Sequence, residues 1–111
     1  MKRIDLLEII RNGGATLDAS GAAVTFARGY QVSKKDCYVL TIGETGKILR
    51  AVNKILNGLQ RGEYCGIWVG GGRVYVDISE RIPRKRDALK IGRERAQISV
   101  FDWRTGAAIY C

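Results

Sequence analysis

Arginine side chains are the residues of this chain whose type and spacing suit chemistry with an anion. Between positions 81 and 95 only Asp87 and Glu94 oppose a run of cations, which comprises Arg81, Arg84, Lys85, Arg86, Lys90, Arg93 and Arg95. Guanidinium groups form paired hydrogen bonds with phosphate. We therefore predict that Arg93, Arg95 and the nearby Arg104 contact the phosphate or ribose of a nucleotide.

Two further arginines stand at the start of a predicted helix. Arg84 and Arg86 are candidates for a second anion site, because the first backbone N–H groups of a helix have no partner within it. The alternative is a solvated basic face. The formal net charge of the chain is +8 and its isoelectric point is about 9.8, and such a field attracts anions without selecting one.

Aromatic residues recur at alternate positions of three predicted strands. Successive strand residues point to opposite faces of a sheet, so one face is expected to be aliphatic and the other to hold Tyr64, Trp68, Tyr75, Phe101 and Trp103. An aromatic face suits base stacking, a subunit interface or packing under a helix. We assign base stacking to Trp68 and Phe101. Asp102 is the candidate acceptor for a ribose hydroxyl or a base amine.

No catalytic or metal-binding pattern emerges from the remaining residues. The chain has no histidine, which is the usual general base and the commonest metal ligand. Cys37, Cys65 and Cys111 are widely separated and fit neither a disulfide framework nor a zinc motif. We expect no enzyme, no cofactor and no metal site.

The elements that position these residues follow from hydrophobic spacing and turn residues. Helices are predicted over about 2–12, from a cap at Thr45 to about 59, and over about 84–96 behind Pro83. The third helix is expected to pack through Ala88, Leu89, Gly92 and Ala96.

Short β-rich runs separate the predicted helices. One hairpin is expected to pair 15–17 with 22–27 around the turn 18–21, and to continue into 29–33. A separate strand is predicted at 37–42. A second hairpin joins 64–69 to 73–79 through three glycines, and a third joins 98–103 to 107–110. This order predicts one small α+β domain over 1–111, with three helices and a mainly antiparallel sheet.

Composition bounds the class of protein. The chain has 111 residues, of which 46% are hydrophobic, so one limited core is expected, and self-association would bury more apolar surface. No run of about 18–20 apolar residues predicts a membrane span. The first eleven residues carry acids within their apolar run, unlike a secretory signal, so we expect a cytoplasmic protein.

Several segments together resemble the type-one Thoeris anti-defence proteins of phages, which act as nucleotide sponges. The resemblance spans nearly the whole chain. The segments that carry it are Gly13-Gly14-Ala15-Thr16-Leu17, Gly29-Tyr30-Gln31-Val32-Ser33, Gly66-Ile67-Trp68-Val69, Val74-Tyr75-Val76-Asp77-Ile78-Ser79, the stretch 87–97 and the stretch 98–102. Where related chains often have Asn-Gln, this chain has Ala96-Gln97.

The resemblance implies a function. A member of this family sequesters a cyclic ADP-ribose isomer, which a bacterial immune sensor makes as an alarm signal, without cleaving it. Some members also hold cyclic di- or trinucleotides at separate sites. Members form dimers that assemble further, up to hexamers, inside the infected bacterial cell.

Two other functions fit the composition. A small basic phage protein that binds single-stranded nucleic acid would use the same cations and aromatic rings. An inhibitor of a host enzyme would use the aromatic face as its contact surface.

Overall fold

Strands β2 (Tyr30–Thr41) and β4 (Arg73–Ile82) form the centre of a single antiparallel sheet. The computed structural model describes residues 5–111, apart from the side chain of residue 36. The sheet has six strands in the order β1-β3-β4-β2-β5-β6. The other strands are β1 (Gly14–Leu17), β3 (Glu63–Gly70), β5 (Ser99–Asp102) and β6 (Ala107–Tyr110). The predicted α+β class and antiparallel sheet are confirmed.

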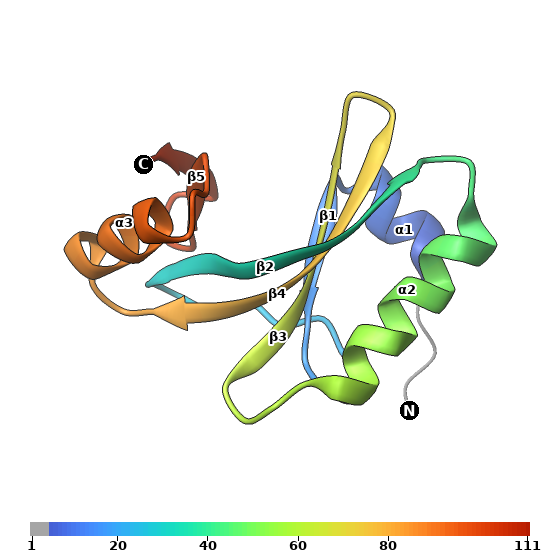
Figure 1. The fold of residues 1–111 in the computed structure, drawn as a ribbon, viewed down its shortest axis with the longest axis horizontal. Helices are drawn as coiled ribbons and strands as arrows, with labels where there is room; N and C mark the ends of the chain where they lie inside the picture. The colour runs from blue at the N-terminus through green and yellow to red at the C-terminus, as the bar shows by residue number, and fades with distance from the viewer. Residues whose placement is uncertain (1–4) are drawn as a thin grey trace.

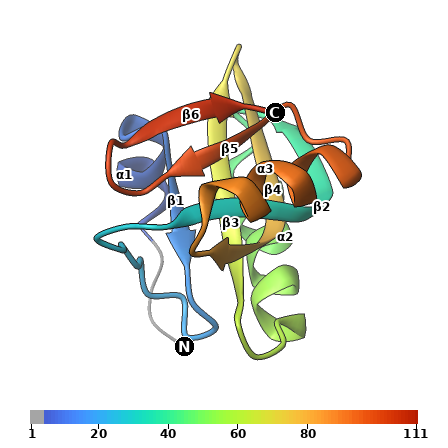
Figure 2. The same cartoon turned by 90° about the vertical axis from the view of Figure 1, so that its left-hand side faces the viewer.

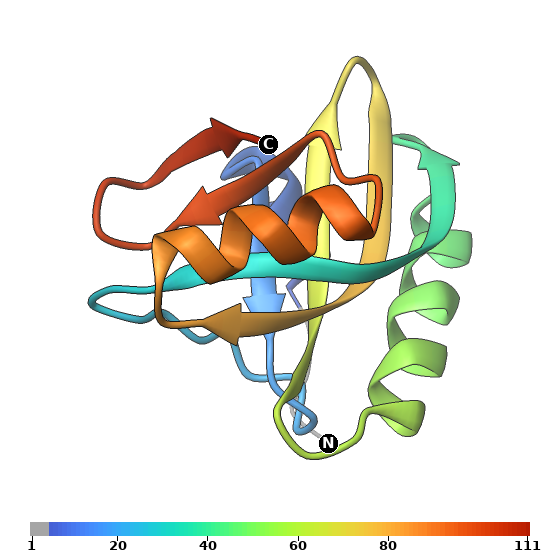
Figure 3. The ribbon, with the colours of Figure 1, turned by 60° about the vertical axis from the view of Figure 1, so that its left-hand side comes forward.

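Three helices pack on this sheet: α1 (Leu6–Arg11), α2 (Thr45–Gly58) and α3 (Lys85–Glu94). Helix α2 lies at one side of the molecule, and α3 lies at the other beside the β5–β6 hairpin (Figures 1, 2 and 3). None of the helices within residues 5–111 is long and apolar enough to cross a lipid bilayer.

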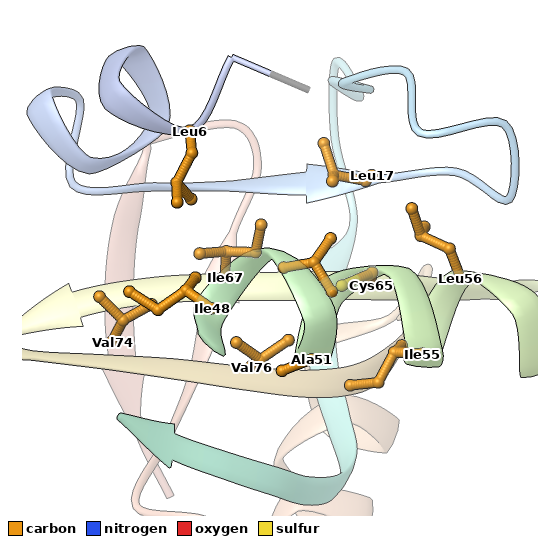
Figure 4. Packing of buried hydrophobic residues seen from close by; sticks show 11 residues of the cluster. Leu6, Leu17, Ile48, Ala51, Ile55, Leu56, Cys65, Ile67, Val74 and Val76 are labelled. Atoms are coloured by element: carbon orange, nitrogen blue, oxygen red, sulfur yellow. The ribbon is translucent and has the colours of Figure 1, made fainter. Parts of the chain in front are cut away.

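The main core lies between α1, α2 and strands β1, β3 and β4. The buried residues of α2 recur every three or four positions, namely Ile48, Ala51, Val52, Ile55 and Leu56. They meet Leu6, Leu17, Cys65, Ile67, Val74 and Val76 (Figure 4). Burying each large aliphatic side chain contributes roughly 1.5–3 kcal/mol, so this cluster fixes α2 against the sheet.

A second, smaller core holds α3. It consists of Val32, Ile82, Ala88 and Val100. Ala88 and Gly92 are the buried residues of α3, as the small-residue pattern predicted, whereas Ala96 lies beyond the helix and is exposed. A Cβ on Gly92 would stand only 3.1 Å from Cγ1 of Val100, so this glycine permits the close approach of α3 to β5.

The glycine hairpin is confirmed and defined more closely. The loop between β3 and β4 consists of Gly71 and Gly72, with φ of 60° and 75°. Two successive positive φ values make the turn type whose twist matches that of paired strands. The turn fixes the register in which Trp68 lies opposite Tyr75 and Gly66 opposite Asp77.

The first predicted hairpin forms only in part. Strand β1 pairs with β3, and residues 22–27 reach β1 only through an isolated bridge between Leu17 and Ala23. The turn itself forms, because Oδ1 of Asp18 accepts hydrogen bonds from the backbone N–H groups of Ser20 and Ala22. This capture of backbone donors by an aspartate competes with strand pairing.

The other strand and helix boundaries also need correction. The runs predicted separately at 29–33 and 37–42 are one strand, β2, whose register with β4 shifts at Ser33/Lys35 and at Asp36/Tyr38. Glu44, not Thr45, precedes α2, and its carboxylate binds Lys47 and the backbone of Thr41. The predicted residues 2–4 of the first helix lie outside the described part of the chain.

Candidate ligand-binding cleft

The face of the sheet that does not contact the main core forms the floor of a cleft of about 1140 Å³. Residues of β4 that point away from the core line it, namely Tyr75, Asp77 and Ser79, while the alternate residues Val74 and Val76 are buried in the core. Segments 21–25 and 96–99 supply further wall residues. The cleft therefore follows from the alternation of side chains along one strand.

A row of aromatic rings crosses this cleft. Trp68 on β3 contacts Phe101 on β5, with ring centroids 5.8 Å apart, although β4 and β2 separate these strands in the sheet. Phe101 meets Trp103 edge to face at 4.9 Å. The sheet must curl strongly to bring these rings together (Figure 1). The predicted grouping of Trp68, Phe101 and Trp103 on one face is confirmed.

Phe26 extends the aromatic row into the long segment between β1 and β2. Its ring meets Trp103 at 5.4 Å and Tyr64 at 5.6 Å. The guanidinium of Arg81 lies 5.3 Å from the centroid of Phe26, and its Nε donates to the carbonyl of Arg28. A cation over a ring face is attracted to it, so these contacts fix the segment that forms one wall of the cleft.

A directed chain of hydrogen bonds lies on the floor. Nε1 of Trp103 donates to Oε1 of Gln31 at 3.0 Å, and Nε2 of Gln31 donates to Oγ of Ser79 at 2.9 Å. Gln31 and Ser79 are both buried. The indole N–H can only donate, so it fixes the orientation of the Gln31 amide.

The acidic residue of the floor is Asp77, which is only 5% exposed. It pairs with Gly66 on β3, and a Cβ at position 66 would collide with Oδ1 of Asp77. On the other side of the strand, burial raises the pKa of the Cys65 thiol to about 12, with smaller contributions from Asp77 and Cys37. The cleft thus keeps a carboxyl group beside a glycine, and Cys65 stays a neutral thiol.

Part of the aromatic surface at the cleft faces solvent. Trp68 is 45% exposed and Tyr75 is 38% exposed. Ile98 and Tyr110, which also line the cleft, are each 79% exposed. Rings that lie partly open beside a polar floor can accept a flat ligand by stacking.

The predicted arginines lie apart from this cleft. No lysine or arginine within residues 5–111 lines it. Arg84, Arg86, Arg93 and Arg104 are exposed. Arg95 is half-buried, lies 3.5 Å from Glu80 and donates to the carbonyl of Ser33 at 3.4 Å. Arg95 directly precedes the segment 96–99 and Arg104 directly follows Trp103, and both this segment and Trp103 line the cleft.

Asp102 has a structural environment that differs from its predicted one. It is 6% exposed, and its Oδ1 accepts a hydrogen bond from the backbone of Arg104 at 2.9 Å. This contact belongs to the turn between β5 and β6, and Asp102 is not among the residues that line the cleft. Of the eight predicted ligand residues, Trp68 and Phe101 are the two that the fold brings together in the cleft.

The polar residues of the floor were not among the predicted site residues. Gln31, Ser79, Asp77 and Gly66 carry no motif, and Gln31 lies 48 residues from its partner Ser79. The signal that could have found two of them is strand alternation, because Asp77 and Ser79 follow Tyr75 at every second position. Among residues 5–111, no group of three or more histidine, cysteine, aspartate or glutamate residues could hold a metal ion.

Comparisons with known proteins give no relative from which to transfer a role. No family model, no curated protein and no solved structure matches the chain.

Proposed function

We propose that this chain binds a cyclic nucleotide in the cleft and sequesters it without cleaving it. The observation that carries the proposal is the row Trp68, Phe101 and Trp103 across a cleft of about 1140 Å³ with a polar, buried floor. Ligand sites combine aromatic walls with a few well-placed polar groups in this way. The resemblance to Thoeris anti-defence proteins supplies the ligand class, a cyclic ADP-ribose isomer.

The proposal divides the ligand between two parts of the protein. The base occupies the cleft, where stacking on Trp68 and Phe101 stabilises it. The phosphates meet arginines next to the cleft segments, with Arg93, Arg95 and Arg104 as the candidates, because a guanidinium group binds phosphate through two N–H donors. Arg84 and Arg86 are proposed for a second anion, such as a cyclic di- or trinucleotide.

A protein that sequesters its ligand does not convert it chemically. The proposal is a binder that keeps its ligand intact, and that thereby prevents an immune signal from reaching its effector in the infected bacterial cell. Assembly into dimers and larger homo-oligomers is part of this proposal, and the exposed Ile98 and Tyr110 beside the cleft would gain burial from a second copy.

Binding and release of an intact ligand test the proposal directly. Isothermal titration of the protein with cyclic ADP-ribose isomers should give saturable binding, and chromatography after denaturation should return the isomer unchanged. Trp68→Ala should weaken binding about 5- to 150-fold, because base stacking on an aromatic ring contributes roughly 1–3 kcal/mol.

The matched control is Trp68→Phe, which keeps an aromatic ring and should retain most of the affinity. Recovery of a cleaved product would show an enzyme instead of a sponge. Equal affinity of the wild type and Trp68→Ala would show that the base does not bind in this cleft.

Single-stranded nucleic acid is the second candidate ligand, and the exposed basic face of α3 favours it. Arg84, Lys85, Arg86, Lys90 and Arg93 are all exposed. A gel-shift titration with a 20-nucleotide single strand distinguishes the two functions, since the sponge should bind the cyclic nucleotide far more tightly than the strand.

A further inference from the structure

We infer that Asp77 selects the base of the ligand, by accepting a hydrogen bond from an exocyclic amine. The inference rests on the proposed function and names the chemical feature that the cleft recognises. It transfers to Asp77 the acceptor role that the sequence suggested for Asp102, whose Oδ1 binds the backbone of Arg104.

Asp77 lies where a stacked base would present its edge. Trp68 and Tyr75 are register partners, and Gly66 and Asp77 are the next pair on the same face. Residues two apart along a strand are separated by about 6.6 Å. A base stacked on Trp68 therefore reaches the Asp77 carboxyl with one edge.

Gly66 leaves room for the Asp77 carboxyl group over strand β3. A Cβ at position 66 would collide with Oδ1 of Asp77. Any other residue at position 66 would push the carboxyl group from its place on the floor. A glycine inside a strand weakens the strand by roughly 0.5–1 kcal/mol. This cost is explained by the close approach of the Asp77 carboxyl group, for which only glycine leaves room.

Asp77 is the strong hydrogen-bond acceptor on the floor of the cleft, because the neighbouring polar groups bond to one another. The Gln31 amide uses its oxygen for Trp103 and its nitrogen for Ser79. Oγ of Ser79 accepts the latter bond, so its own hydrogen points elsewhere as a donor. Oδ1 of Asp77 is buried against Gly66, so Oδ2 is the oxygen that meets the ligand, and a carboxylate oxygen has about two acceptor positions.

The charge of the cleft favours a neutral donor over a phosphate at this position. No lysine or arginine within residues 5–111 lines the cleft, whereas Asp5 and Glu8 line it together with Asp77. An adenine amine donates to a carboxylate. In hypoxanthine a carbonyl oxygen replaces that amine, so two hydrogen-bond acceptors would face each other with no proton between them. Sites that hydrogen-bond a substrate group strongly reject the analogue that lacks it.

The experiment compares each cyclic ADP-ribose isomer with its deaminated counterpart, cyclic IDP-ribose, by isothermal titration. The wild type should prefer the amine-bearing ligand by at least about 10-fold, which is roughly 1.4 kcal/mol. Asp77→Asn should reduce this preference to within about 3-fold, because an amide can present either its oxygen or its NH₂ group. Asp87→Asn, a control on the exposed surface of α3, should keep the wild-type preference.

The outcomes separate the two proposals. If neither ligand binds to the wild type, the proposed function fails and this inference falls with it. If the wild type binds both ligands equally, or if Asp77→Asn keeps the full preference, the inference alone is overturned. Gly66→Ala provides a second variant that displaces the carboxyl group, and it should also lose the preference. Thermal melts of every variant establish that the protein tested is folded.

Discussion

Alternate residues of strands β3 and β4 serve different roles, since one set packs in the core and the other lines the cleft. Cys65 and Ile67 are buried in the core, while Gly66 and Trp68 line the cleft. A change at one of these positions therefore affects either stability or ligand binding, according to its parity. Asp77 is the exception, because its charge also acts on the thiol of Cys65 through the strand.

Cys65 makes the stability of the protein fall in alkaline solution. Its pKa is raised from 9.0 to about 12 in the folded state, chiefly by burial. Above pH 9 the unfolded chain loses this proton while the folded chain retains it, so the free energy of unfolding decreases as pH rises. Between pH 8 and pH 10, urea unfolding should show a loss of about 1.4 kcal/mol from this thiol.

Cys65→Ala isolates that contribution from the titration of other groups. The variant should be less stable at pH 7, because it leaves a small cavity, yet its stability should fall less steeply with pH. Parallel curves for the two proteins between pH 8 and pH 10 would show that Cys65 ionises as easily in the folded state as in the unfolded chain.

At the scale of elements, the end of α3 contains an unfavourable residue. The N–H of Ala96 donates to the carbonyl of Arg93 at 3.0 Å, and the N–H of Gln97 donates to the carbonyl of Gly92 at 2.8 Å. This pair of bonds is the Schellman motif, whose first residue beyond the helix takes a positive φ. Ala96 has φ of 56°, a conformation in which glycine and asparagine are common and alanine is rare.

Ala96→Gly should therefore stabilise the protein by about 1 kcal/mol, measured as the free energy of unfolding in urea. Ala96→Asn should give a smaller gain, because asparagine also tolerates positive φ. Ala108→Gly in strand β6 is the matched control, and it should destabilise the fold, since glycine weakens an ordinary strand. A loss of stability in Ala96→Gly would contradict the role assigned to this backbone angle.

The elements that sequence alone could predict are those with strong local signals. Helix α2 and the Gly71-Gly72 turn carry strong local signals, a five-residue apolar pattern and two residues that accept positive φ. Pairing of 22–27 with β1 is limited to the bridge between Leu17 and Ala23, while β1 pairs along its whole length with β3, about 50 residues away. Local pattern predicts pairing between adjacent segments and carries no signal for a partner at that separation.

At the scale of the whole molecule, the cleft depends on curvature that the sequence does not reveal. Strand parity predicted the shared face of Trp68, Phe101 and Trp103. It could not show that Trp68 and Phe101 meet across the two intervening strands, or that Gln31 and Ser79 bond beneath them. Nor could it show that the cationic run lies on the exposed surface of α3, apart from the residues that line the cleft.

The +8 charge of the chain and the absence of lysine and arginine from the lining of the cleft, within residues 5–111, predict different salt responses for two classes of ligand. Affinity for a single strand falls with salt in proportion to the phosphates neutralised, with a slope of about −0.7 per phosphate. A cyclic nucleotide with two phosphates, held partly by stacking, should lose less than about 10-fold in affinity between 50 and 300 mM salt. A strand that contacts six cations should lose about 1,000-fold.

Two exposed lysines of α3 show whether the same surface serves both ligands. Lys85→Ala combined with Lys90→Ala removes two charges from α3, outside the residues that line the cleft. The double variant should flatten the salt slope for a single strand by about 1.4 and leave the affinity for the cyclic nucleotide unchanged. An equally steep salt slope for both ligands would mean that the cyclic nucleotide binds to the basic surface of α3 through its phosphates, with its base outside the aromatic cleft.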